Sequence, residues 1–384
     1  MNSYRSPSAT ILVLLGTAAL AGCAATGKIE SFETGETIAI TEQDERGLWH
    51  QSDDFDEAVR YAGVLYTDPA LLEYLQQVTD RLFPEFAGKI RVHVLRSLVP
   101  NAFVIPNGST YLDAGLLAYL DNEAQLAAII GHEGSHFVRR HSLRSSRTAK
   151  QNLAAAAVFG SAIGLPGTAQ ILAYSSIMGY SRDLEREADR EGFDRILNAG
   201  YDPREAVHLF ERLARHAKAM DYDDPVFFSS HPRMSERIDT FRSLAAGSTG
   251  GAEIGESPFR RAAAGITNSY LEAATERGDH KALIHLLEEE DKLALLAPRC
   301  AYYLAEAYRR RDEAGDIETA EHNYRQTLDV APDHARAHAA LGTILMKSGR
   351  YAEAREHLTR YLELDPEAQD RAYIEQYIAE LAGR

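Results

Sequence analysis

A short run near residue 130, GHEGSHFVRRHS, holds two histidines and a glutamate whose types and spacing suit metal chemistry. His132 and His136 are four residues apart, so in a helix both imidazoles project from one face and can reach one metal ion. Glu133 is one position round the helix, close enough to polarise a metal-bound water without being a ligand. The pattern H-E-x-x-H therefore predicts a zinc site with Glu133 as general base. The alternative is a surface helix with two solvated histidines, so a third ligand is needed.

The residues before this run favour a helix. The segment EAQLAAII is apolar at helical spacing, and Asp121 or Asn122 precedes it as a candidate N-cap. Gly134 weakens a helix by about 1 kcal/mol relative to alanine, which a packed helix tolerates. A residue this small also lets another element come close.

A second segment, SRDLEREADREGFDRILNAGYDP, offers the missing ligand. Its apolar spacing predicts a helix on which Glu185 and Asp189 share a face, while Glu187 points away. One carboxylate can bind a metal, and another can hold a ligand histidine by its other ring nitrogen. The alternative is a solvated face of Arg/Glu ion pairs, which Arg182, Arg186 and Arg190 would supply.

These two segments, together with NAFVIPNGSTYLDAGLL and HPRMSERI, span residues 101–238 and resemble zinc metallopeptidase family 48. That family includes the prenyl-protein endopeptidases, the HtpX-type proteases and periplasmic members with C-terminal tetratricopeptide repeats. The resemblance implies one Zn²⁺ per chain. It selects Glu185 as the third ligand and places Asp189 behind a ligand histidine.

The segment HPRMSERI matches the family pattern H-P-x-x-x-x-R. The resemblance implies that His231 is a fourth metal ligand that gates a resting form, or a hydrogen-bond donor to the tetrahedral intermediate. It implies that Arg237 contacts the substrate or the transition state. The residues alone indicate only a turn before a helix, with Pro232 at its first position.

Strands should lie beside the metal helix. KIRVHVLRS alternates like a strand, and NAFVIPNGSTYL predicts a hairpin that turns at residues 106–108. Pro106 makes the first arm of this hairpin an edge strand. We therefore expect Phe103, Val104 and Ile105 to bind substrate as an added strand. The predicted fold class is α+β and predominantly helical.

The N-terminal residues predict export. Arg5 precedes an apolar run, Ala9–Ala21, which is too short to cross a bilayer and suits the core of a signal peptide. The run ends in LAGC, which resembles the bacterial lipobox and implies lipidation of Cys23. Ala24 follows in place of an aspartate, which points to the periplasmic face of the outer membrane. The alternative is an ordinary secretory signal with a coincidental cysteine.

The amino-acid composition limits the kinds of molecule that the protein is expected to bind. The formal net charge is −16, and residues 1–22 carry one arginine and no acid, so the chain after Cys23 processing carries −16 − 1 = −17. This charge argues against nucleic-acid binding. With Cys23 acylated, the only other cysteine, Cys300, has no disulfide partner in the chain. Residues 152–180 are strongly apolar, and glycines and a proline interrupt them, so a buried or membrane-surface helical pair is favoured over a transmembrane hairpin.

The C-terminal third repeats itself. AEHNYRQTLDVAPDHA and AREHLTRYLELDPEAQ align at a spacing of 34 residues, with Ala320 matching Ala354 and Pro332 matching Pro366. This period and the small residues are typical of tetratricopeptide repeats, whose helix pairs stack on one another. Two such repeats need flanking helices, which residues 260–295 and 368–382 are expected to supply.

The predicted organisation therefore has five parts: signal peptide 1–22, tether 23–50, zinc metallopeptidase domain 51–245, linker 246–258 and all-α repeat domain 259–384. The predicted function is cleavage of unfolded or misassembled outer-membrane proteins. The repeat domain would bind substrate or the outer-membrane assembly machinery, and the lipid anchor would bind the membrane. The alternative is a chaperone or assembly adaptor with little or gated proteolysis.

Overall fold

The computed structural model describes residues 29–32, 38, 40, 42–151, 180–220, 234–248, 250–289 and 299–382. Several predictions from the sequence lie outside these residues: the signal peptide, the lipidation of Cys23, the apolar segment up to residue 179, and His231. No helix within the described part of the chain is both long and apolar enough to cross a membrane.

A small mixed sheet forms the heart of the N-terminal half. Its strands are β1 (Leu65–Tyr66), β2 (Arg91–Leu95), β3 (Ala102–Val104) and β4 (Ser109–Asp113), in the order β1-β2-β4-β3. The central pair, β2 and β4, is parallel, and the two outer pairs are antiparallel. Strand β3 lies at one edge, as the proline after it predicts, and its side chains are buried.

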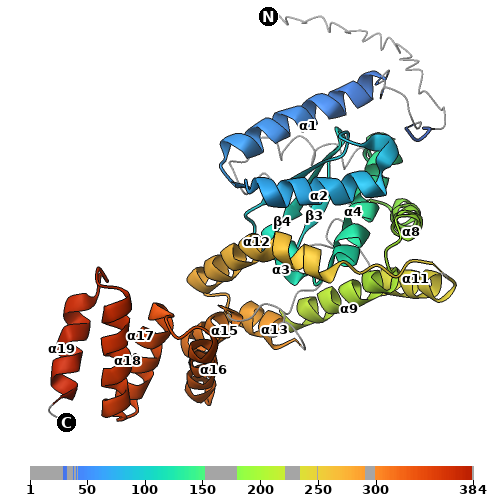
Figure 1. Ribbon diagram of the computed structural model, residues 1–384. Coiled ribbons are helices and arrows are strands. Elements are labelled where there is room, and N and C mark those ends of the chain that lie inside the picture. The colour runs from blue at the N-terminus through green and yellow to red at the C-terminus, as the bar shows by residue number, and fades with distance from the viewer. Residues whose placement is uncertain are drawn as a thin grey trace, which may run out of the picture.

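Helix α1 (Gln43–Tyr61) covers part of this sheet (Figure 1). The Phe55 ring packs edge-on against Phe103 and Tyr111, and Asp56 accepts hydrogen bonds from Ser109 and Tyr111. The helix thus begins inside the stretch expected to be a tether. Phe32 is also docked, because its N–H donates to the Val138 carbonyl at 3.0 Å.

Helix α4 (Glu123–Val138) carries the H-E-x-x-H residues, and all of its side chains are buried. It is enclosed by β3 and by helices α2 (Pro69–Leu82), α8 (Arg182–Asn198) and α9 (Arg204–Ala219). Asn122 is its N-cap, accepting from the Gln125 N–H at 2.9 Å. Small and apolar residues surround the two histidines and the glutamate on α4, so neighbouring elements can pack against every side of this helix.

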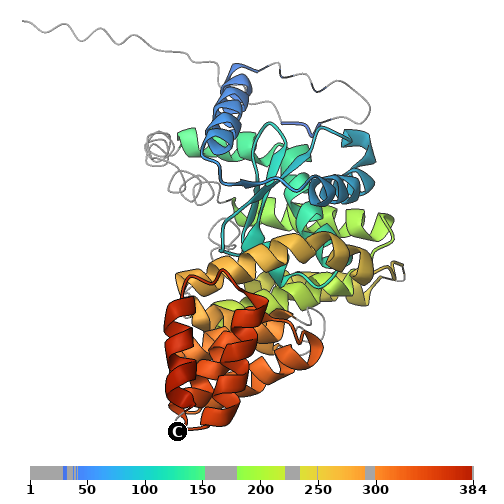
Figure 2. The same ribbon diagram turned by 60° about the vertical axis from the view of Figure 1, so that its left-hand side comes forward.

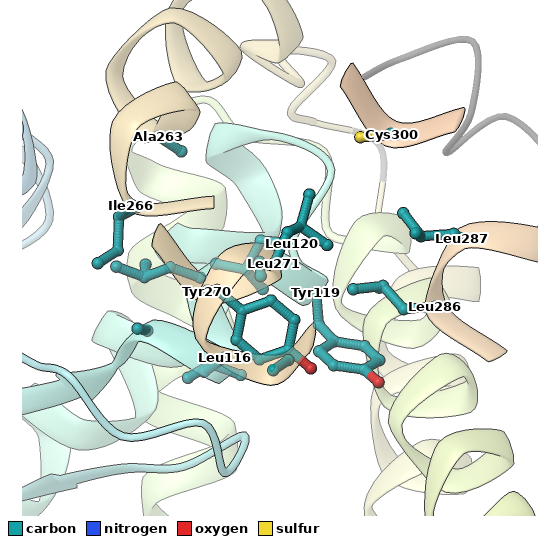
Figure 3. Packing of buried hydrophobic residues seen from close by; sticks show 14 of the residues in the cluster. Leu116, Tyr119, Leu120, Ala263, Ile266, Tyr270, Leu271, Leu286, Leu287 and Cys300 are labelled. Atoms are coloured by element: carbon teal, nitrogen blue, oxygen red, sulfur yellow. The ribbon is translucent and has the colours of Figure 1, made fainter. Parts of the chain in front are cut away.

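The predicted linker is packed too. Helix α11 (Met234–Ala246) ends the predicted peptidase domain, called the peptidase part below, and α12 (Glu256–Arg277) begins ten residues later. Between them, the Asp202 N–H donates to the Glu253 carbonyl, and the Ala124 N–H to the Ile254 carbonyl. Figure 3 shows α12 lying on α3 (Ala114–Tyr119). The buried side chains here belong to one hydrophobic cluster, which includes Leu116, Tyr119, Leu120, Ala263, Ile266, Tyr270 and Leu271. Helix α12 therefore belongs to the core of the peptidase part as much as to the repeats.

The C-terminal helices pack as antiparallel pairs (Figure 2). They are α13 (His280–Glu288), α15 (Arg299–Arg311), α16 (Asp316–Val330), α17 (Ala335–Lys347), α18 (Tyr351–Leu364) and α19 (Arg371–Leu381). The matched alanines of the repeat, Ala320 and Ala354, are fully buried. The helical repeat domain and the predominantly helical α+β class are both confirmed.

Candidate metal centre

Two glycines bring the helices of the site together. Gly131 of α4 faces Gly192 of α8, and a Cβ added at Gly192 would lie 3.0 Å from the backbone of Gly131 and His132. The helices thus cross with their backbones in contact, closer than any side chain would allow. This crossing carries the acidic face of α8 directly to the histidines of α4.

Three side chains with metal-binding atoms converge at the crossing. His132 Nε2 and His136 Nε2 are 3.1 Å apart, and the Glu185 carboxylate oxygens lie 3.5 Å and 3.4 Å from them. All three side chains are buried. A tetrahedral zinc with bonds of about 2.0–2.2 Å separates its ligand atoms by roughly 3.3 Å. Among the residues that the structure describes, this is the cluster whose donor atoms could hold a metal ion, and its spacing and donor chemistry fit zinc.

Asp189 and Arg237 lie behind His132. The Nδ1 atom of His132 is 2.9 Å from Asp189 Oδ1 and 3.0 Å from an Arg237 nitrogen. Burial raises the pKa of Asp189, but the charge of Arg237 and the hydrogen bond from His132 outweigh it and leave that pKa below its usual range. An ionised Asp189 fixes the His132 tautomer with a proton on Nδ1, which leaves Nε2 free to bind a metal.

Arg237 lies behind the first histidine, and its suggested contact with substrate or the transition state stays a prediction. Its guanidinium binds Asp189 through two nitrogens, at 3.0 Å and 2.8 Å, and lies over the Phe210 ring. Only 3% of the residue is exposed. This geometry supports a role in holding Asp189 and His132.

Glu133 is fully buried on the same helix turn as the two histidines. The next residue, Gly134, explains how this turn is packed, because a Cβ there would lie 2.4 Å from the Phe83 ring. The guanidinium of Arg195 covers the same ring, at 4.1 Å from its centroid. Glycine at this position therefore makes room for an aromatic side chain beside the site, as its small size suggested.

The residues that contact His136 were not predicted from the sequence. Its Nδ1 atom lies 2.8 Å from Nδ1 of His141, and the Tyr180 ring stacks on it at 4.0 Å and 15°. His141 is fully buried, and burial lowers its pKa to about 4. The available signal was a third histidine five residues after His136, in the same quoted run.

The structure thus brings His132, Glu133, His136, Glu185 and Asp189 into one buried cluster. Phe103, Val104 and Ile105 lie on or just after the edge strand β3, which contacts α4. His231 falls outside the described residues, so its suggested role at the site stays a prediction.

Comparison with known proteins agrees with this arrangement. Residues 69–245 match Peptidase family M48, and residues 304–368 match a tetratricopeptide repeat family. The first match contains every residue of the cluster and the crossing of α4 with α8. The second covers the stacked helices from α15 to the end of α18.

Individual relatives are similar over part of their length. The mitochondrial metalloendopeptidase OMA1 of Schizosaccharomyces pombe is 34% identical over 39% of this chain and 45% of its own length. The beta-barrel assembly-enhancing protease of Yersinia pestis is 27% identical over 55% of this chain and 45% of its own. A putative protein of the same name from Vibrio cholerae is 32% identical over 46% of this chain and 40% of its own. The chain spans less than half the length of these relatives.

Proposed function

Since this chain carries a family M48 peptidase domain followed by tetratricopeptide repeats, we propose that it is a zinc-dependent endopeptidase. The observation that carries the proposal is the convergence of three buried side chains beside Glu133, with the two histidine nitrogens 3.1 Å apart and one oxygen of the Glu185 carboxylate near each, at 3.5 Å and 3.4 Å. His132, His136 and Glu185 would hold the metal. The names of the relatives, a metalloendopeptidase and an assembly-enhancing protease, support the same reaction class.

Each residue of the cluster then has a chemical task. Bound zinc would supply a Lewis acid that polarises the scissile carbonyl and makes a water molecule more acidic. Glu133 would take a proton from the attacking water and return it to the leaving nitrogen. Asp189, held ionised by Arg237, keeps His132 in the tautomer that binds metal.

An extended substrate would bind along the outer edge of β3 once that edge is uncovered, because the residues of β3 expose 2% of their surface or less. Strand β3 pairs with β4 on one side and contacts the metal helix. A polypeptide added along its other side would gain backbone hydrogen bonds without any particular sequence. Folded proteins seldom offer a free strand, so this mode of binding selects unfolded or misassembled chains.

The proposed location follows from the N-terminus and the relatives. Lipidation at Cys23 would anchor the protein to the periplasmic face of the outer membrane. Newly arrived outer-membrane proteins that fail to assemble would be its substrates there. The repeat domain would bind these substrates or the assembly machinery, as stacked helical repeats commonly bind other proteins.

Replacing Glu133 with glutamine tests the proposal. Glu133→Gln removes the base and keeps the three ligands, so zinc content should stay at one per chain while cleavage of unfolded casein falls by a factor of about 10²–10⁴. Zinc is measured by elemental analysis, and cleavage by the release of labelled peptides. A Glu133→Gln variant that cleaves casein at the wild-type rate would overturn the mechanism. Zinc-loaded wild type that prevents aggregation but cleaves nothing would favour the chaperone alternative.

A further inference from the structure

The two ligand histidines of α4 are both held through their second ring nitrogen, but by different partners. Behind His132 lies the Asp189 carboxylate, 2.9 Å from Nδ1. Behind His136 lies another imidazole, with the Nδ1 atoms of His136 and His141 2.8 Å apart.

We propose that His141, with Glu187 behind it, is the positioning residue that holds His136 as a metal ligand. This inference rests on the proposed metal site. It assigns the second histidine a relay of imidazole and carboxylate, where the first has the Asp189 carboxylate with Arg237 beside it.

The hydrogen bond between the two rings fixes their tautomers. If His136 binds metal through Nε2, its single proton is on Nδ1, and that N–H can only donate to His141. His141 Nδ1 must then be the acceptor, so the proton of the neutral His141 is on Nε2. The direction of the relay follows from the chemistry of imidazole, whichever hydrogen positions are drawn.

A carboxylate lies near the nitrogen that carries this second proton. His141 Nε2 is 3.5 Å from Glu187 Oε2, close enough for electrostatic attraction although long for a hydrogen bond. Glu187 also accepts from Arg144 at 2.8 Å, and that cation keeps the carboxylate ionised. A negative charge beside Nε2 favours the tautomer of His141 that accepts from His136.

The backbone is bent to bring His141 back to the site. Arg140, between α4 and α5 (His141–Gln151), has a φ of 52°, in the left-handed region that non-glycine residues seldom adopt. Its guanidinium is held by an ion pair with the buried Glu45 and by the Glu30 carbonyl at 3.1 Å. A strained residue persists only where its surroundings hold it, and such residues are frequent at functional sites. The bend places the first residue of α5 directly behind the last histidine of α4.

Helix α8 thereby serves the site at three positions. Glu185 supplies the carboxylate ligand, Asp189 lies behind the first histidine, and Glu187 lies behind His141. From the sequence alone, Glu187 belongs to a face of α8 that could be solvated and paired with arginines. In the structure this residue instead helps to hold a proposed metal ligand through His141.

The test measures how tightly the full-length holoenzyme holds zinc. His141→Phe keeps an aromatic ring but removes the acceptor, whereas His141→Asn keeps an acceptor, because its side-chain oxygen takes roughly the place of Nδ1. We expect competition with a chromophoric chelator to show zinc affinity about 10–100-fold weaker in His141→Phe, which is the usual effect of removing such support. Affinity should return to within about threefold of wild type in His141→Asn, and Glu187→Gln should fall between the two.

A buried histidine far from the site provides the matched control. His216 of α9 bonds to Tyr119 at 2.8 Å near the repeat domain, so His216→Phe should keep wild-type zinc affinity. Wild-type affinity in His141→Phe would overturn the relay. In that case loss of zinc in His136→Ala would show that the metal site itself stands, whereas zinc retained in His136→Ala would overturn the proposed function.

A second measurement needs no variant. Nitrogen-15 shifts of selectively labelled histidines in the wild-type holoenzyme report which ring nitrogen carries the proton. The relay requires His136 protonated on Nδ1 and His141 protonated on Nε2. Finding the proton of His141 on Nδ1 would overturn it, even if His141→Phe failed to fold.

Discussion

Both halves of the molecule use a glycine to bring two helices close, but with different partners. In the peptidase part, Gly192 of α8 meets the backbone of Gly131 and His132. In the repeat part, a Cβ at Gly342 of α17 would lie 2.8 Å from the Leu358 side chain of α18. The Ala354 carbonyl of α18 lies further from that Cβ position, at 3.3 Å. A leucine side chain can change its rotamer more readily than a backbone can move. The first contact is therefore set by two backbones, and the second mainly by a side chain.

The two helix contacts also differ in the kinds of residue that they bury. The α4–α8 crossing buries two histidines and three carboxylates, namely Glu133, Glu185 and Asp189. The α17–α18 contact buries mainly small and apolar residues such as Leu341, Ala354 and Leu358. Buried ionisable groups need partners at the right distance, because each lost hydrogen bond leaves a buried polar group unpaired and lowers the free energy of unfolding. The comparison indicates that a fixed helix spacing matters most where a metal has to be held.

The largest expected difference comes from adding one methyl group to each contact. Gly192→Ala forces the α4 and α8 backbones apart and should lower the free energy of unfolding by about 1–3 kcal/mol. It should also weaken zinc binding at least tenfold, because Glu185 moves away from the histidines. Gly342→Ala should change the unfolding free energy by less than about 1 kcal/mol, since alanine is the better helix former and Leu358 can move.

Thermal unfolding and chelator competition, measured on both variants, check these two predictions. Zinc affinity in Gly342→Ala should equal that of the wild type. The comparison fails if the two variants lose stability and zinc affinity to the same extent.

A smaller effect is expected at the junction of the two parts. His216 of α9 is buried beside Tyr119 and His285, and burial, with a smaller contribution from His285, lowers its pKa to about 4. The unfolded chain protonates this histidine near pH 6.5, so its neutral form contributes stability above that pH. This contribution is lost as the pH falls from about 6.5 towards 4.

Denaturant titrations at pH 7.5 and pH 5 measure the loss. The wild type should lose more stability between these pH values than His216→Phe does, because phenylalanine takes up no proton. An identical pH dependence in the two proteins would show that His216 is accessible to protons in the folded state.

The features that the sequence predicted well were those with a local period or a short motif. The helical spacing of His132 and His136, the hairpin around Pro106 and the 34-residue repeat all depend on nearby residues. The structure adds that Asn122, of the two candidates, caps the metal helix. Local patterns specify these features because the relevant side chains lie on one element.

Other features depended on contacts between distant segments, which one sequence does not show. The role of Glu187 follows only once α5 folds back through the bend at Arg140. The docking of Phe32 on the end of α4 could not be read from a polar N-terminal segment. The ion pair between Arg237 and Asp189 joins residues that are 48 positions apart in the chain.

The most direct test of the central claim is the zinc content of two glutamate variants on one helix. Glu185→Gln removes a proposed ligand, whereas Glu191→Gln removes a half-buried carboxylate that instead pairs with Arg139 and Arg195. Elemental analysis of the purified full-length proteins should find one zinc per chain in the wild type and in Glu191→Gln, and little or none in Glu185→Gln. Full zinc occupancy in Glu185→Gln would contradict the claim that the α4–α8 crossing builds the metal site.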